Sequence, residues 1–240
     1  MSFIITLHVR EGIVMATDSR LTLNTQGQAG QIMLAVGQSD TAQKLFLTKT
    51  NVGISTAGNA DIQGVPIAGF VESFIHDVVE SQNMEVDQVA QALLQHFRGL
   101  PQPPNSVFHV AGYKKKEKTL DQQVWKVVVN QNVNQQVNPS GGQGATWDGE
   151  SDILVRLIQP VAPLTPQGQI AGALPLHTIP WGFFTLQDAI DFAVFAERST
   201  IDVLRFLPRP KTVGGPIDVC VIKPSSADWV QKKQLAVRLS

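Results

Sequence analysis

The chain has 240 residues, enough to bury a full hydrophobic core, and sandwich-type folds of this length commonly form one domain. Hydrophobic residues make up 43% and charged residues 16%, and the formal net charge is -1, which excludes a strong field for nucleic acid or an anionic membrane. No run of about 18 apolar residues and no basic segment followed by an apolar stretch occurs, so we expect a cytoplasmic protein.

Strand signals dominate the beginning of the chain. The polar segment 21–43 carries three glycines and is expected to be a long hairpin or loop. On either side of it lie runs rich in β-branched and aromatic residues, which are typical of strands. These runs are residues 3–9, 13–16, 44–48 and 52–56.

Two amphipathic helices are expected next. Apolar residues recur at helical spacing over residues 67–78 and again over residues 86–97. Asp61 is expected to cap the first of these helices, with Pro66 inside its first turns, where a missing N–H costs little. Gly99 is expected to end the second helix.

The second half of the chain again alternates strands and helices. A capping-box pattern, Thr185 with Asp188, opens a helix that is apolar nearly all round. Residues 160–181 contain repeated prolines and glycines and are expected to form an ordered, irregular excursion. Strands are expected at 106–113, 123–133, 216–222 and 229–239, a lysine-rich hairpin tip at 114–118, and a short helix at 152–158.

This order predicts an α+β protein with one domain, residues 1–240. The expected architecture is a four-layer αββα sandwich, in which two stacked antiparallel sheets are flanked by helices. The single cysteine, Cys220, lies in an apolar run and is expected to be a buried free thiol.

Three blocks of sequence resemble a known family. Residues 12–22 contain a glycine, a short apolar strand and then the pattern Asp-Ser-Arg-x-Thr. Residues 44–61 contain a lysine on an expected strand, followed by a glycine turn. Residues 213–219 contain Gly-Gly just before a late strand. Together they resemble the proteasome β-subunits and their bacterial relatives, HslV and the Anbu-type proteins. The resemblance covers nearly the whole chain and implies the N-terminal-nucleophile (Ntn) hydrolase fold.

The resemblance also implies a set of catalytic residues. Ser2 matches the nucleophile, which becomes the first residue when Met1 is removed; a small residue after methionine permits that removal, so no propeptide is required. Asp18 and Lys44 match the other two catalytic positions. Gly58 matches a glycine whose backbone N–H stabilises the tetrahedral oxyanion.

The free amine at the chain start would act as the base for the Ser2 hydroxyl. An α-amino group has a pKa of about 7.7 to 8.0, so part of it is neutral near pH 7. A Lys44 ammonium beside it would favour the neutral amine and the developing alkoxide, and Asp18 would hold that ammonium. The activity implied is that of a peptidase or amidohydrolase acting through an acyl-enzyme.

Two further residues are expected beside the substrate. Thr22, with the residues around Gly58, would pair with an extended peptide by strand addition. Arg20 is expected near the substrate, with a structural rather than a catalytic role.

The sequence also departs from the family pattern. Pro210 and Val213 stand where the family carries a supporting Asp and Ser, and the glycine-serine element beside the nucleophile is not recognisable. Residues 148–151, Asp-Gly-Glu-Ser, occupy about the place of that element, and Asp148 is a weak substitute for it. These departures leave two alternatives open: a non-catalytic assembly or binding subunit with the same fold, and a small-molecule Ntn amidase.

Expected partners follow from the resemblance. It implies a homo-oligomeric ring, and it leaves an ATPase partner open. Nucleic acid and membranes are not expected as partners. The sequence contains no phosphate-binding loop, no paired His/Cys spacing and no dinucleotide fingerprint, so neither a cofactor nor a metal is expected.

Overall fold

Two five-stranded sheets, both antiparallel throughout, form the centre of the computed structural model, which describes residues 2–26, 32–175 and 177–235. The strands of the first sheet are β1 (Phe3–Val9), β2 (Gly12–Thr17), β12 (Gly144–Gly149), β13 (Asp218–Lys223) and β14 (Ser226–Gln231). Those of the second are β5 (Leu45–Leu47), β6 (Gly53–Gly58), β9 (Ser106–Lys116), β10 (Thr119–Val128) and β11 (Val133–Gln136). Their orders are β12-β1-β2-β13-β14 and β11-β10-β9-β6-β5.

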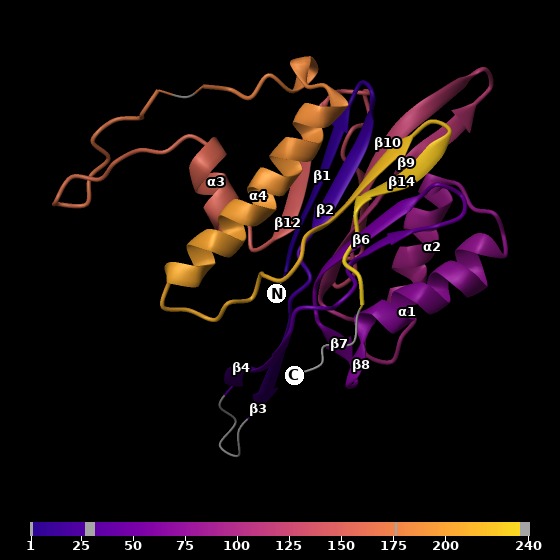
Figure 1. Ribbon diagram of the computed structural model, residues 1–240, viewed down its shortest axis with the longest axis horizontal. Helices are drawn as coiled ribbons and strands as arrows, with labels where there is room; N and C mark the ends of the chain where they lie inside the picture. Colours follow the sequence, from indigo (N-terminus) through magenta and orange to yellow (C-terminus); the bar gives the residue numbers. More distant parts are fainter. Residues whose placement is uncertain (1, 27–31, 176, 236–240) are drawn as a thin grey trace.

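Helices cover the outer face of each sheet (Figure 1). On the first sheet lie α3 (Asp152–Ile158) and α4 (Leu186–Phe206). On the second lie α1 (Ile67–Phe74), which continues as a π-helical segment over Ile75–Glu80, and α2 (Val86–Arg98). The described residues therefore form a sandwich of mixed α and β structure, as the α+β prediction required.

Two neighbouring inner strands of the first sheet, β1 and β2, are buried on both faces. Phe3 and Ile5 of β1 pack toward α3 and α4, whereas Ile13 and Met15 of β2 pack toward the second sheet. Because strand residues alternate between faces, such strands need apolar side chains on both sides. Cys220 of β13 is fully buried in the same layer between the sheets, as predicted.

Asp61 caps a turn rather than a helix. It lies in β7 (Asp61–Ile62), which pairs with β8 (Val65–Pro66), and its Oδ1 accepts a hydrogen bond of 2.9 Å from Gly64 N. An aspartate that binds the backbone in this way stabilises a tight turn. Helix α1 begins directly after β8, so Pro66 precedes the helix and does not lie inside it.

The helix signals in the second half are confirmed. Helix α3 has the predicted bounds, and α4 begins with the predicted capping box. Thr185 N donates to Asp188 Oδ2 at 2.8 Å, and Asp188 N donates to Thr185 Oγ1 at 3.2 Å. Two otherwise unpaired backbone donors are thereby satisfied, which is why this pair marks a helix start.

Several strand predictions need correction. β12 was not predicted, since glycines and polar residues give it a weak strand signal, and the strand predicted to reach residue 133 ends at Val128 before a turn into β11. The final strand ends at Gln231, and residues 236–240 lie outside the described residues.

The long hairpin or loop predicted over residues 21–43 is a hairpin over much of its length. β3 (Leu21–Gln26) pairs with β4 (Ile32–Ser39), while Gly27 and Gly30 lie outside the described residues. The irregular excursion after α3 is confirmed. Within the described part of the chain, no helix is both long and apolar enough to cross a membrane.

Candidate functional site

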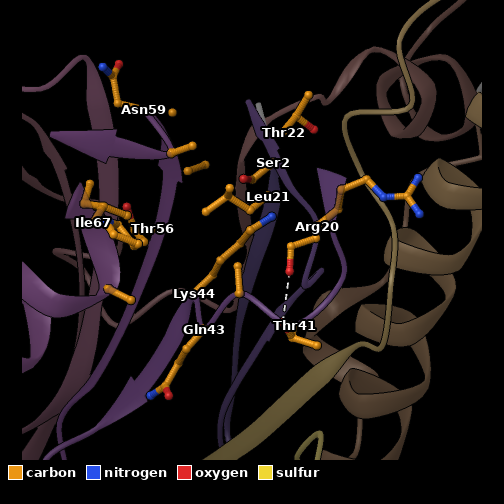
Figure 2. A pocket seen from close by; sticks show the side chains of 17 residues that line it. Ser2, Arg20, Leu21, Thr22, Thr41, Gln43, Lys44, Thr56, Asn59 and Ile67 are labelled. Atoms are coloured by element: carbon orange, nitrogen blue, oxygen red, sulfur yellow. Dashed lines mark hydrogen bonds between the residues drawn. The ribbon is translucent and has the colours of Figure 1, made fainter. Parts of the chain in front are cut away.

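A pocket of about 270 Å³ lies beside the start of the chain, at one end of the two sheets. Its lining is mostly apolar, and it combines segments that are far apart in sequence (Figure 2). The lining includes Ser2, Thr22, Lys44, Thr56, Gly58 and Ile67. Of the residues predicted for the site, Asp18 is absent from this lining, because it is buried behind Lys44.

Asp18 is held by four hydrogen-bond donors. Its Oδ1 accepts from Lys44 Nζ at 2.7 Å and from Phe3 N at 3.3 Å. Its Oδ2 accepts from Arg20 N and Gly214 N, both at 3.0 Å. Hydrogen bonds to an ionised carboxylate are strong, so the fully buried Asp18 fixes Lys44 and the backbone next to Ser2 in one arrangement.

Lys44 brings a buried amine to the mouth of the pocket. Asp18 follows β2 of the first sheet and Lys44 precedes β5 of the second, so their ion pair connects the two sheets. Figure 2 shows the Lys44 side chain reaching toward Ser2. Burial lowers the pKa of Lys44, and the Asp18 carboxylate acts in the opposite direction. A positive charge in this place favours a developing alkoxide on Ser2.

The backbone of Ser2 is fixed by the end of β12. Glu150 N donates a hydrogen bond of 2.9 Å to Ser2 O, and Phe3 is opposite Gly149 in the strand pair. Gly149 has φ of 92°, and a Cβ atom there would lie 1.9 Å from Ser2 O. Only glycine is therefore compatible with this close approach.

The Glu150 side chain extends the same contact to a second segment. Thr212 Oγ1 donates to Glu150 Oε1 at 3.0 Å, and Arg209 lies 3.6 Å from Glu150 Oε2. Two residues later, Gly214 donates to Asp18. The segment around residues 209–214 thus connects the backbone of Ser2 to the Asp18–Lys44 pair.

This segment contains the two departures noted in the sequence. Val213 is buried among the apolar residues that pack under α4, and its side chain has no polar atom that could support the site. The carbonyl oxygen of Pro210 accepts a hydrogen bond from Thr212 N. Thr212, between them, supplies a hydroxyl to Glu150 instead. Sequence reasoning placed residues 148–151 at about the position of this support but selected Asp148 rather than Glu150, and it missed Thr212, because only the fold brings positions so far apart together.

Asp148 does not substitute for the missing element beside Ser2. Its carboxylate lies 3.0 Å from His109 Nε2 and 2.6 Å from Lys126 Nζ. Burial alone would raise the pKa of Asp148, but His109 and Lys126 hold it below its ordinary value. His109 Nδ1 lies 3.0 Å from Thr6 Oγ1, and both residues are fully buried, so this group is a polar connection between the sheets.

The other predicted residues occupy distinct places. The Arg20 guanidinium donates to both Asp40 carboxylate oxygens, at 2.6 and 2.8 Å, and points away from Ser2 in Figure 2. Thr22 lines the pocket and is buried, and its Oγ1 has no hydrogen-bond partner among the described residues. Gly58 also lines the pocket with φ of 119°, and a Cβ atom there would meet the backbone of Asn105.

A buried carboxyl group lies near the ion pair. Glu197 of α4 is fully buried, and both its carboxyl oxygens lack a hydrogen-bond partner within the described ranges. Burial raises the pKa of Glu197 well above its ordinary value; the Asp18 charge acts in the same direction and Lys44 in the opposite one. Sequence reasoning missed this residue, although an acidic residue on the buried face of an apolar helix was a usable signal.

Comparison with known proteins assigns no family. No protein-family model matches the sequence, and no curated protein matches it. Over residues 2–26, 32–175 and 177–235, no group of three or more His, Cys, Asp or Glu side chains is placed to hold a metal ion. The functional argument therefore rests on the geometry around Ser2.

Proposed function

We propose that the protein is a proteasome-like Ntn peptidase or amidohydrolase that uses Ser2, after removal of Met1, through an acyl-enzyme. The observation that carries the proposal is the buried Lys44–Asp18 pair beside Ser2, at the mouth of an apolar pocket. Taking an ion pair out of water is costly, and perturbed charges in a cleft are characteristic of functional sites. The helix–sheet–sheet–helix arrangement supports the Ntn fold as part of the same proposal.

The reaction begins at the hydroxyl of Ser2. Its Oγ attacks the substrate carbonyl while the free α-amine of Ser2 accepts the proton. The Lys44 ammonium stabilises the developing negative charge, and the backbone N–H of Gly58 stabilises the tetrahedral oxyanion. Collapse of this intermediate breaks the amide C–N bond while the Ser2 α-ammonium returns its proton to the leaving nitrogen, which releases the amine product and leaves an ester on Ser2. Water then hydrolyses the ester and restores the hydroxyl.

The pocket favours an uncharged apolar side chain of the substrate. The described residues that line the pocket include no Asp or Glu. They include two cations, and each is paired with a carboxylate: Arg20 with Asp40, and Lys44 with Asp18. A charged side chain would lose its hydration there without gaining a free counter-ion. An extended substrate backbone would pass between Thr22 and Gly58.

Two alternatives each have one observation in their favour. Val213 puts a buried apolar side chain where the family carries a polar support, which suits a non-catalytic assembly or binding subunit. The modest pocket volume suits a small-molecule amidase. Profiling hydrolysis of peptide libraries against simple amides distinguishes the peptidase from the amidase.

A covalent probe tests the proposal directly. We expect the intact mass of the protein to correspond to loss of Met1, and treatment with an acylating β-lactone to add one acyl group to Ser2. Peptide mapping locates the adduct, and the Ser2→Ala variant serves as the control that takes up none. Full hydrolytic activity in a chain that retains Met1, or absence of an adduct on Ser2, would contradict the proposal.

The pH dependence of kcat/KM is expected to be bell-shaped. Activity should rise with pH as the Ser2 amine loses its proton, at a pH below the ordinary range of about 7.7 to 8.0, because the Lys44 ammonium favours the neutral amine. It should fall as the Lys44 ammonium deprotonates, at a pH below the ordinary 10.5, because burial lowers the pKa of Lys44. In Lys44→Arg the alkaline fall should move beyond the measurable range, since arginine stays charged. An alkaline limb that is identical in both proteins would show that Lys44 does not titrate in catalysis.

A further inference from the structure

Glu197 lies on the face of α4 that packs against the first sheet. It is fully buried, and its neighbours on that face are small residues: Ala189, Ala193, Ala196 and Thr200. The Thr200 hydroxyl is satisfied within the helix, since it donates to Ala196 O at 2.9 Å. Within the described ranges, neither carboxyl oxygen of Glu197 has such a partner. A buried polar group without a partner costs free energy, so this carboxyl requires an explanation other than packing.

The surroundings of Glu197 favour its neutral form. Asp18 already carries a negative charge there, and it accepts hydrogen bonds from four donors. A second carboxylate would be repelled by Asp18 and would have no donors of its own. Burial raises the pKa of Glu197, and the Asp18 charge acts in the same direction. Glu197 is therefore expected to hold its proton at neutral pH.

Lys44 is the group on which Glu197 can act. Burial lowers the pKa of Lys44, whereas Asp18 and a charge on Glu197 raise it. Lys233, which is paired with Asp218 in a second buried ion pair, lowers the pKa of Lys44 by repulsion. With Glu197 neutral, Asp18 is the carboxylate that holds the Lys44 proton against burial and against a second ammonium. An ionised Glu197 would assist it.

The other titratable groups around α4 have partners or face water. The elements packed against this helix are β1, β2 and α3, and β2 contains no titratable side chain. The groups of β1, of α3 and of the segment before β13 are each held elsewhere: His8 by Gly142 O, Asp152 by Arg156 and Arg209, and Lys211 by Leu207 O. The other charged residues of α4 are exposed, namely Asp188, Asp191, Arg198, Asp202 and Arg205.

We propose that Glu197 is a positioning residue for the reaction at Ser2, a buried acid that gives up its proton before Lys44 does and so keeps Lys44 charged. As the pH rises, the first proton passes to solvent from one of these two groups. Loss from Glu197 leaves a carboxylate that attracts the Lys44 ammonium, whereas loss from Lys44 leaves Asp18 buried without its counter-charge. The first route is therefore favoured, and the two groups titrate as a coupled pair. The catalytic meaning of this inference rests on the proposed function.

The titration of Lys44 tests the inference without an assay of activity. In protein with isotope-labelled lysine, the nuclear magnetic resonance signal of Lys44 is identified by its loss in Lys44→Arg. Glu197→Gln keeps the shape of the side chain and removes the ionisable proton, so its Lys44 should titrate about one pH unit lower, a tenfold weaker hold on the proton. Glu197→Met, which is apolar and of similar length, should give the same shift.

Thr200→Val is the matched control. It removes a buried polar atom from the same face of α4 without changing a charge, and its Lys44 should titrate as in the wild type. A Lys44 midpoint that is unchanged in both Glu197 variants, or that Thr200→Val lowers equally, would overturn the inference.

The proton on Glu197 is measured by denaturation at a series of pH values. A folded-state pKa above the unfolded value of about 4.3 means that the folded protein binds the proton more tightly. The resulting stabilisation is complete below that value and is lost as the pH rises toward the folded-state pKa. Relative to Glu197→Gln, the wild type should therefore lose up to about tenfold in its folding equilibrium constant per pH unit in this range. A difference between the two proteins that does not vary with pH would contradict a protonated Glu197.

Kinetics separates this inference from the proposed function. In Glu197→Gln the alkaline fall of kcat/KM should move to lower pH together with the Lys44 midpoint. If the Lys44 midpoint moves but the wild type hydrolyses no amide, the enzyme proposal fails and the control of the Lys44 charge by Glu197 stands. If the wild type is active and the alkaline fall is identical in both proteins, the positioning role fails alone.

Discussion

Replacing Ser2 by alanine is expected to reduce kcat by ~10⁴-fold or more, because removing a catalytic nucleophile leaves only binding and oxyanion stabilisation. Alanine is small enough to permit removal of Met1, so the free amine remains and only the hydroxyl is lost. The Asp18–Lys44 pair does not contact the Ser2 side chain through any observed hydrogen bond and should stay intact. Turnover of a fluorogenic peptide, normalised to folded protein, measures the effect.

Ser2→Thr is the matched control for this variant. Threonine keeps the hydroxyl and the amine and adds a methyl group that restricts χ1, so substantial activity should remain. Thermal unfolding of the three proteins should agree closely. If Ser2→Ala turns over substrate at the rate of the wild type, Ser2 is not the nucleophile and the enzyme proposal fails.

Replacing Lys44 by methionine is expected to affect both activity and stability. Catalysis loses the cation that stabilises the developing alkoxide on Ser2. Asp18 also stays buried without its counter-charge, which should lower the free energy of unfolding by ~3–5 kcal/mol. Three backbone N–H groups still donate to Asp18, which places the expected loss toward the lower end of that range. Chemical denaturation and steady-state kinetics measure the two effects separately.

A double variant distinguishes the catalytic role of Lys44 from its structural role. Asp18→Asn/Lys44→Met removes both charges and should recover much of the lost stability, since replacing a whole buried pair by neutral groups is often nearly neutral. Activity should not recover, because the cation is still missing. Recovery of stability and activity together would mean that Lys44 serves only to hold the fold.

The sequence was informative wherever local chemistry decides the structure. Thr185 and Asp188 predicted the start of α4, because a capping box satisfies backbone donors whatever surrounds it. The block from Gly12 to Thr22 and the position of Lys44 predicted a pair that the fold brings to 2.7 Å. Neither the family nor the activity implied by that block is tested by this geometry, and both stay predictions.

The sequence was uninformative where distant segments decide the structure. Glu150 and Thr212 look like ordinary polar surface residues until β12 and the segment before β13 bring them together. Asp61 has the side chain of a typical helix cap, but it accepts a hydrogen bond from the backbone N–H of Gly64, three positions later, and so stabilises a turn. β12 has little intrinsic strand propensity and is ordered by its pairing with β1.

The contacts of Ser2 also determine when the site is completed during synthesis. Ser2 is synthesised long before the two residues that support the site: Glu150 holds the carbonyl of Ser2, and Gly214 holds the carboxylate of Asp18. A nascent chain that lacks residue 214 has only part of this support and cannot order the chain start as the finished protein does. Competence for the proposed reaction is thus delayed until the segment that contains Gly214 has been synthesised and has folded against Asp18.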